Sequence, residues 1–186
     1  EISGNHKQSK TTAKKLIKEI RKSGAQAVKL QTYTPDTMTF DLKNDEFLIK
    51  NKKSLWYGEY LYDLYKKAYT PWGWQKELYD YAKDLGLICF SSVFDDTAIE
   101  FLQRINNPIY KISSFENTDL ELIKNASLKK KPVILSTGLA SLSDLNEAVN
   151  IIKKYGSGKF ALLKCTSSYP AKSIDSNLLT INRSEE

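Results

Sequence analysis

Hydrophobic and polar positions follow a regular order in the second half of the chain. Short apolar runs, which predict buried strands, occupy residues 87–92, 109–113, 132–136 and 160–165. Apolar residues at helical spacing lie between these runs, at residues 97–105, 119–128 and 143–155. This alternation predicts βα units built around parallel strands that are buried on both faces.

The first half of the chain predicts the same kinds of element at less regular spacing. We expect helices at residues 9–23, 59–68 and 71–85, and a strand at residues 27–33. Residues 35–57 form an irregular, charged stretch that is long for a connection in a compact domain. We therefore expect that stretch to cover a site rather than merely to join two elements.

The predicted helix at residues 71–85 carries a start signal and an apolar face. Thr70 supplies a side chain that can cap the helix, and Pro71 suits its first turn. The expected apolar stripe comprises Trp74, Leu78, Tyr81, Ala82 and Leu85. This stripe should pack the helix against the strands.

Polar side chains gather where the predicted strands end. They are Asn5-His6, Gln31-Thr32, Ser91-Ser92, Ser113-Ser114, Ser136-Thr137-Gly138 and the run from Thr166 to Tyr169. In a (β/α)8 barrel the C-terminal strand ends surround one mouth, whereas a doubly wound open sheet binds its ligand at a single switch point. We therefore expect an α/β fold of the TIM (β/α)8 type, incomplete, with about six of its eight strands present, as one domain over residues 1–186.

Two lysines lie inside apolar strand patterns, which is unusual for an ionisable side chain. Lys29 shares one face of its strand with Gln31, and Lys111 precedes two serines at the end of another strand. Lysines and hydroxyls together suit a phosphate, and Glu116 could transfer a proton beside a phosphorylated substrate. The alternative is that both lysines are ion-paired or extend to solvent, and that Glu116 and the hydroxyls only cap helices.

Composition narrows the function classes. The net charge is +6, but the lysines are spread over helix faces without a basic and aromatic stripe, so we expect no nucleic-acid binding. We expect no membrane span and a cytoplasmic location, since no apolar run approaches about 18–20 residues and no signal peptide opens the chain. Cys89 and Cys165 should be reduced buried thiols without a function. No Walker A, GxGxxG, GxSxG or HExxH motif occurs.

Seven segments in order resemble the N-terminal catalytic domain of the sialic acid synthase family, and within it most closely the pseudaminic acid synthases. They are EISGNH, AVKLQTYTPDTMT, LWYGEYLYDLYKKAYTPWGW, FSSVFD, YKISSFE, ILSTG and KCTSSYPA. The resemblance implies an enzyme, a transferase of alkyl groups, that condenses phosphoenolpyruvate with an open-chain aminosugar aldehyde. The expected aldehyde is of the 2,4-diacetamido-2,4,6-trideoxy-altrose type, and the products are pseudaminic acid, for flagellin or surface-glycan modification, and phosphate. The resemblance further implies a homodimer at full length and a divalent metal (Mn, Mg or Co).

The resemblance assigns roles position by position. Glu1 and Glu116 match acidic residues near the reacting carbons, and Glu116 is the expected proton-transfer group. The expected substrate-binding residues are Lys29, Gln31, Ser92, Lys111, Ser114, Ser136, Ser167 and Tyr169. In the implied mechanism the metal polarises the aldehyde, C3 of phosphoenolpyruvate attacks it, and water adds at C2 before phosphate leaves.

The sequence also departs from the family pattern. The family's two metal-binding histidines lie in motifs that would follow Glu186, and His6, expected to be structural, is the only histidine here. We therefore expect strands seven and eight, the C-terminal antifreeze-like domain and the metal to be absent, and the chain to be inactive alone. Gly73 and Val93 replace a glutamate and a proline of the pattern.

Three functions stay open on the sequence. The first is a pseudaminic acid synthase, with N-acetylneuraminate synthase as the alternative within the same class. The second is an inactive remnant that binds only phosphoenolpyruvate or an intact synthase. The third is another phosphate-binding barrel of central metabolism.

Overall fold

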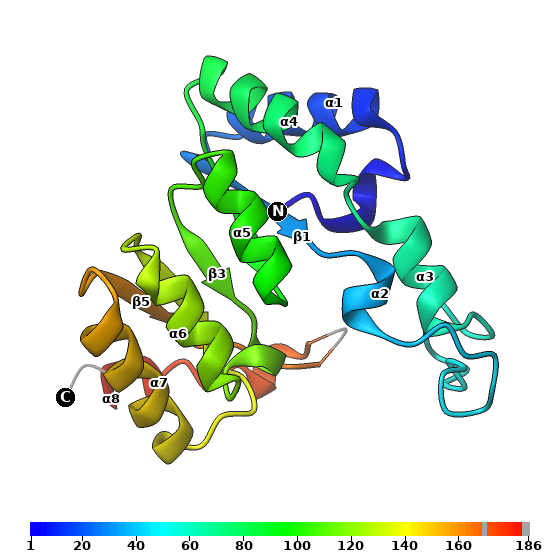
Figure 1. Cartoon of the computed structure of the whole chain (residues 1–186). Helices are drawn as coiled ribbons and strands as arrows, with labels where there is room; N and C mark the ends of the chain where they lie inside the picture. The colour runs from blue at the N-terminus through cyan, green and yellow to red at the C-terminus, as the bar shows by residue number, and fades with distance from the viewer. Residues whose placement is uncertain (169–170, 184–186) are drawn as a thin grey trace. The chain divides into compact units, whose positions relative to one another are not determined.

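The structure, a computed structural model, describes residues 1–168 and 171–183 and divides the chain into two compact units, Glu1–Asn107 and Pro108–Glu186 (Figure 1). The first unit contains two strands and the second contains three, among the described residues, and the pairings within each unit are parallel. The expected α/β class is therefore confirmed.

The first unit consists of two paired strands and the helices around them. In chain order its elements are η1 (Ser3–His6), α1 (Lys10–Lys22), β1 (Ala27–Thr32), α2 (Pro35–Met38), α3 (Leu61–Ala68), α4 (Trp72–Asp84), β2 (Ile88–Val93) and α5 (Asp96–Arg104). Helices α1 and α4 pack side by side, and α4 also contacts β2 (Figure 1). Ser9 caps α1 by accepting a hydrogen bond from the Thr12 amide.

Side chains on β1 alternate between two environments. Val28 and Leu30 are buried on one face, while Lys29 and Gln31 are half-buried on the other. The register pairs Gln31 with Ser92 of β2. The predicted separation of the polar and apolar faces is therefore confirmed.

Three details of the first unit differ from the sequence predictions. Residues 3–6 form the 3-10 helix η1 rather than a strand end, although the Ile2 amide still donates to the Lys29 carbonyl, 3.1 Å away. Pro71 occupies the N-cap position of α4, and Thr70 does not cap it. The buried face of α4 comprises Gln75, Leu78, Tyr79 and Ala82. Leu78 and Ala82 of the expected stripe are therefore confirmed, whereas its other three members are only half-buried.

The second unit repeats a strand-helix order. Its elements are β3 (Tyr110–Ile112), η2 (Ser114–Glu116), α6 (Leu120–Leu128), β4 (Val133–Ser136), α7 (Leu142–Tyr155), β5 (Phe160–Leu163), η3 (Ser173–Asp175) and α8 (Thr180–Arg183). Strand β4 lies between β3 and β5 in the parallel register Tyr110–Val133–Phe160. Helices α6 and α7 pack against each other (Figure 1). Ser141 and Asp144 form a capping box at the start of α7.

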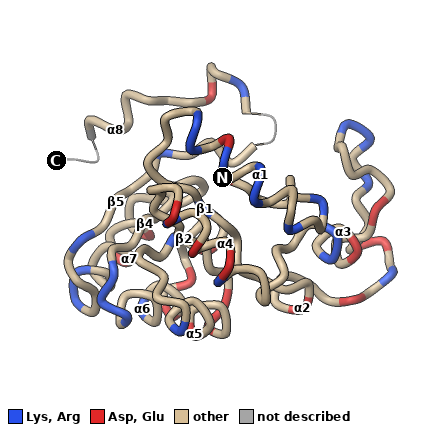
Figure 2. Tube along the Cα trace, turned by 90° about the horizontal axis from the view of Figure 1, so that it is seen from above, with Lys and Arg blue, Asp and Glu red and all other residues tan. Residues whose placement is uncertain are grey.

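Charged residues are interspersed along the trace. Figure 2 shows Lys and Arg on many helices and loops, with Asp and Glu between them. Several of these residues form exposed ion pairs, such as Lys76 with Asp80 and Lys14 with Glu77. In the part of the chain that the structure describes, no helix is long and apolar enough to cross a membrane.

Candidate functional site

Lys111 is the buried cation of the second unit. It lies in the middle of β3 and is only 5% exposed. Its ammonium donates to the hydroxyl of Ser136, 2.7 Å away at the end of β4, and to the Ile112 carbonyl at 2.5 Å. These acceptors offset part of the cost of burying the charge, and they leave a positive site lined by a hydroxyl.

Two further hydroxyls converge beside Gly138, in the turn after β4. A Cβ atom at Gly138 would lie 2.2 Å from Ser167 Oγ and 2.8 Å from Ser114 Oγ, so a larger residue would displace both hydroxyls. The Ser167 hydroxyl is buried and has no hydrogen-bond partner in the described part of the chain. We call Lys111, Ser114, Ser136 and Ser167 the Lys111 cluster. A buried cation with three hydroxyls is suited to a phosphate or a carboxylate.

Glu116 belongs to the same unit and ends η2. Burial raises its pKa above the ordinary carboxyl value, and the nearby positive charge of Lys111 only partly opposes that effect. Its Oε2 atom is buried without a hydrogen-bond partner among the described residues. A raised pKa makes the ionised carboxylate a stronger base than an exposed one, which suits Glu116 to proton transfer.

Lys29 organises a second group of side chains, in the first unit. Its ammonium lies 2.7 Å from a carboxylate oxygen of Glu1 and donates to Ser92 Oγ at 3.3 Å. Gln31 lies on the same face of β1 and accepts a hydrogen bond from Ser3 Oγ at 3.1 Å. We call Glu1, Lys29, Gln31 and Ser92 the Lys29 cluster. Glu1 is 40% exposed, so this ion pair is weak enough to be exchanged for an anionic ligand.

The structure thus groups the predicted site residues within each unit. Four of them form the Lys29 cluster, and Glu116 and the Lys111 cluster lie together in the second unit. Tyr169 lies outside the described residues. For Lys29 the ion-paired alternative applies in part, because Glu1 neutralises it.

Two residues near the Lys111 cluster were missed by the sequence analysis. Asn117 is buried and donates to the Gly138 and Ser136 carbonyls. Cys165, which we expected to be without a function, is half-buried and its thiol contacts Ser136 Oγ at 3.3 Å. The position of Asn117 directly after Glu116 was a usable signal for the first. No local pattern distinguished Cys165 from a core cysteine such as Cys89, whose pKa burial raises to about 12.

His6 has a structural environment. It is fully buried, its Nδ1 accepts from the Gln8 amide, and its Nε2 pairs with Thr70 Oγ1 at 3.1 Å. Within residues 1–168 and 171–183, no group of three or more His, Cys, Asp or Glu side chains could hold a metal ion. The described residues therefore do not fit the divalent metal implied by the resemblance, and we derive no step through a metal.

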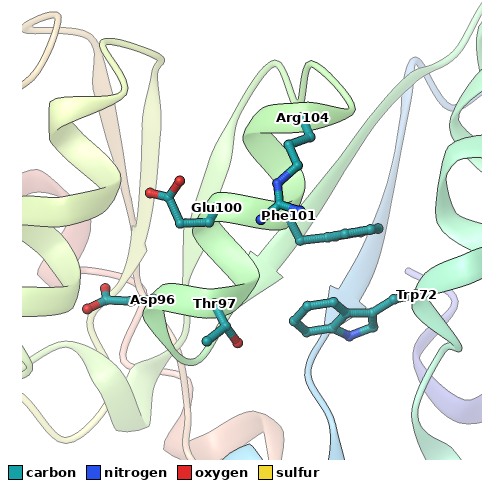
Figure 3. Close-up of a pocket in the computed structure, with 6 residues that line it drawn as sticks. All are labelled: Trp72, Asp96, Thr97, Glu100, Phe101 and Arg104. Atoms are coloured by element: carbon teal, nitrogen blue, oxygen red, sulfur yellow. The ribbon is translucent and has the colours of Figure 1, made fainter.

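A separate pocket of about 380 Å³ lies on the first unit, between the start of α4 and helix α5. Figure 3 shows Trp72 facing Phe101, with Arg104 above and Asp96 and Glu100 directed to the other side. The two rings lie 4.8 Å apart between centroids. The pocket is lined by aromatic rings and by side chains of both charges, unlike either lysine cluster. It contains none of the predicted site residues.

Comparison with known proteins gives consistent matches over nearly the whole chain. A model of the NeuB family matches residues 16–186. The chain is 46% identical to the pseudaminic acid synthase of Helicobacter pylori, over 97% of this chain and 53% of that protein. It is 41% identical to the pseudaminic acid synthase of Campylobacter jejuni, over 96% of this chain and 51% of that protein. The chain therefore spans about half the length of these curated relatives.

A solved structure supports the fold. The N-acetylneuraminic acid synthetase of Leptospira borgpetersenii, in complex with citrate, superposes with a TM-score of 0.83 at 30% identity. The match covers 96% of this chain and 57% of that one. The structural neighbours are synthases of the TIM-barrel type, so the expected partial barrel is confirmed.

Proposed function

Because the chain belongs to the NeuB family, we propose that it carries part of a synthase that condenses phosphoenolpyruvate with an aminosugar aldehyde to give pseudaminic acid and phosphate. The identity to two pseudaminic acid synthases supports the choice of product. The observation that carries the proposal is the Lys111 cluster, because phosphoenolpyruvate offers a phosphate and a carboxylate to a buried cation that contacts one hydroxyl, with two more hydroxyls beside the adjacent turn.

In this proposal the Lys111 cluster binds the anionic groups of phosphoenolpyruvate. Lys111 supplies a positive charge. Because the residue is buried, solvent and salt screen its attraction to a ligand only weakly. The hydroxyls of Ser114, Ser136 and Ser167 supply directed donors, and the unpartnered Ser167 hydroxyl is the one most in need of a ligand. When the anion binds, polar groups that lack a hydrogen-bond partner form charge-assisted hydrogen bonds with it.

The proposed reaction forms a carbon-carbon bond and breaks a carbon-oxygen bond. C3 of phosphoenolpyruvate attacks the aldehyde carbon, whose oxygen takes a proton from solvent, and water adds at the C2 cation. The C2–O bond to phosphate then breaks, and phosphate leaves with the proton of the C2 hydroxyl, whose oxygen becomes the ketone oxygen. Glu116, in its ionised form, accepts the proton that the water releases, and the rise of its pKa on burial makes it a stronger base than an exposed carboxylate.

The Lys29 cluster is proposed to bind substrate through Lys29, Gln31 and Ser92, with Glu1 as the exchangeable partner of Lys29. Tyr169 is proposed to contact the aminosugar. A divalent metal is proposed for the intact family enzyme and not for the described residues of this chain. When bound, such an ion would increase the electrophilic character of the aldehyde carbon.

A second candidate is N-acetylneuraminate synthesis. The specific observation in its favour is the superposition on the Leptospira borgpetersenii synthetase. The two reactions share phosphoenolpyruvate and differ in the sugar, so they make the same demands on the Lys111 cluster.

The deciding experiment measures phosphoenolpyruvate binding and product formation separately. Isothermal titration of phosphoenolpyruvate into the purified chain should show one site, and Lys111→Met should weaken it by about tenfold or more. Lys159→Met, which removes an exposed lysine from the same unit, is the matched control and should bind as the wild type does. Equal affinity in the two variants would contradict the assignment.

Product analysis then separates the sugars. The chain is incubated with phosphoenolpyruvate, Mn²⁺ and either 2,4-diacetamido-2,4,6-trideoxy-altrose or N-acetylmannosamine, and products are identified by mass spectrometry. Pseudaminic acid from the first sugar alone supports the first candidate. Binding without any product, as we expect for this chain alone, supports a polypeptide that only binds phosphoenolpyruvate.

A further inference from the structure

Asn117 links two backbone carbonyls of the turn after β4. Asn117 is only 1% exposed. Its amide nitrogen donates to the Gly138 carbonyl at 2.8 Å and to the Ser136 carbonyl at 3.3 Å. Both N–H groups of one amide are therefore directed at the backbone segment that carries the Ser136 hydroxyl. That hydroxyl is in turn 2.7 Å from Lys111 Nζ.

The turn that Asn117 holds is strained. Leu139 has a φ angle of +68°, in the left-handed region that a leucine rarely adopts. Its side chain is 72% exposed, so packing contributes little to holding this conformation. The two hydrogen bonds from Asn117 therefore oppose the tendency of the turn to relax.

The placement of Gly138 depends on this turn. Its α-carbon approaches the hydroxyls of Ser114 and Ser167 so closely that a Cβ atom would collide with them. A small shift of the turn would carry Gly138 and Ser136 out of register with these hydroxyls. The geometry of the Lys111 cluster is thus set by the backbone and not only by its own side chains.

We propose that Asn117 is a positioning residue that fixes the Ser136–Gly138 backbone so that the hydroxyls of the Lys111 cluster converge on one anion. Asn117 acts through the backbone and touches no substrate atom. The inference rests on the proposed function for the identity of the anion, but the backbone role itself can be measured without any ligand.

The first test measures by hydrogen exchange how firmly the turn is held. The Thr137 amide donates to the Leu163 carbonyl at 3.0 Å, so its hydrogen exchange reports whether the turn stays attached. Asn117→Leu keeps the size of the side chain and removes both donors. We expect about tenfold faster exchange at Thr137 in this variant, with unchanged exchange at the Ile123 amide of α6. Asn146→Leu, an exposed change on α7, is the matched control.

The second test reads anion binding. Inorganic phosphate and phosphoenolpyruvate are titrated separately into the wild type, Asn117→Leu and Asn146→Leu at one salt concentration. We expect Asn117→Leu to weaken both anions by about the same factor, tenfold or more, because both use the same cluster. If the wild type binds neither anion, the proposed function fails, whereas the exchange at Thr137 still decides the role of Asn117.

A third variant separates positioning from general damage to the fold. Asn117→Asp can donate one hydrogen bond only when its carboxyl is protonated. Its phosphate affinity, relative to Asn146→Asp, should therefore recover as the pH is lowered from about 8 to about 5.5. Unchanged exchange at Thr137 in Asn117→Leu, or wild-type phosphate affinity in that variant, would overturn the inference.

Discussion

At the scale of single residues, the second unit keeps one charge and one carboxyl group buried near each other. Lys111 is held by a hydroxyl and a carbonyl, and Glu116 has a buried oxygen without a partner among the described residues. Burial disfavours the charged form of both groups. The ammonium of Lys111 has two acceptors that offset this cost, whereas the pKa of Glu116 is raised. This difference suits one group to binding and the other to proton transfer.

Replacing Glu116 should separate stability from activity. Its pKa is raised in the folded state, so the stability gained by keeping it neutral is present below the unfolded value of about 4.5 and is lost as the pH rises through the folded value. Glu116→Gln avoids that loss, so its melting temperature should exceed that of the wild type by more at pH 7.5 than at pH 4.5. In a chain or assembly that turns over, the same change should lower kcat by about a hundredfold or more.

Circular dichroism at several pH values and phosphate release provide the two readouts for Glu116→Gln. Glu147→Gln, an exposed change on α7, is a control for a general effect of removing a negative charge. A melting-temperature difference that stays constant with pH would show that Glu116 does not titrate as inferred.

Residues whose role follows from the periodicity of an element were predicted from the sequence. Residues whose role follows from a contact with a distant segment were not. The alternation of β1 was enough to place Lys29 and Gln31 on one face. Asn117 and Cys165 acquire their roles from segments twenty or more residues away, which no local pattern encodes. Contacts of this kind became visible only with the structure.

At the scale of elements, η1 is fixed to the segment between α3 and α4 by one buried side chain. His6 reaches Thr70 through Nε2 and packs edge-on against Trp74. Thr70 therefore serves this contact rather than the helix cap that the sequence suggested.

Acid should loosen this contact. Burial lowers the pKa of His6 below its ordinary value of 6.5, so the unfolded chain takes up a proton before the folded chain does. Stability should therefore fall as the pH drops from about 7.5 through 6.5 and below. His6→Gln, which cannot be protonated, should flatten this part of the profile, as measured by urea unfolding.

Since His6 is the only histidine, it is the only side chain with an ordinary pKa in this range. Thr70→Val provides an independent check, because it removes the partner and should cost about 1–3 kcal/mol at pH 7.5 while leaving the histidine in place. Parallel pH profiles for the wild type and His6→Gln would refute the assignment.

Most elements were predicted within one or two residues, because capping residues and strand-helix alternation are local signals. The helix predicted to start at residue 119, for example, has Asp119 as its N-cap in the structure. The buried face of α4 was misjudged because Gln75, a polar residue, finds a partner in Thr32 on the neighbouring strand. Burial of a hydrogen-bonded polar group cannot be read from hydropathy.

At the scale of the whole molecule, the last described segment exposes apolar side chains. Ile174 and Leu179 are each 84% exposed, and Leu178 is also exposed. Exposed apolar residues this close together in the sequence are unusual for a surface that only meets water. We expect the isolated chain to associate with itself as its concentration rises.

Sedimentation velocity can test this expectation. The double variant Ile174→Lys with Leu179→Lys should reduce the concentration dependence of the sedimentation coefficient. The matched control, Leu128→Lys with Leu142→Lys, changes two exposed leucines at separate places and should behave as the wild type does. An equal reduction in both double variants would point to net charge and not to this segment.

The family resemblance was confirmed over almost the whole chain, whereas the roles of the individual site residues remain predictions. Ordered motifs identify a family because each one combines a strand end with its polar side chains. They do not determine which sugar is used, since that depends on contacts with a ligand.

The pairing of β1 with β2 has a consequence for biosynthesis. Ala27 pairs with Ile88, so β1 has no strand partner from its own unit until the residues between them have left the ribosome. At about 5–20 residues per second this delay lasts several seconds, during which a strand containing a charged lysine stays exposed. The partners in the second unit, such as Tyr110 and Val133, follow each other much sooner. Lys29 and Gln31 keep one face of this unpaired strand polar, which opposes its association with other chains during translation.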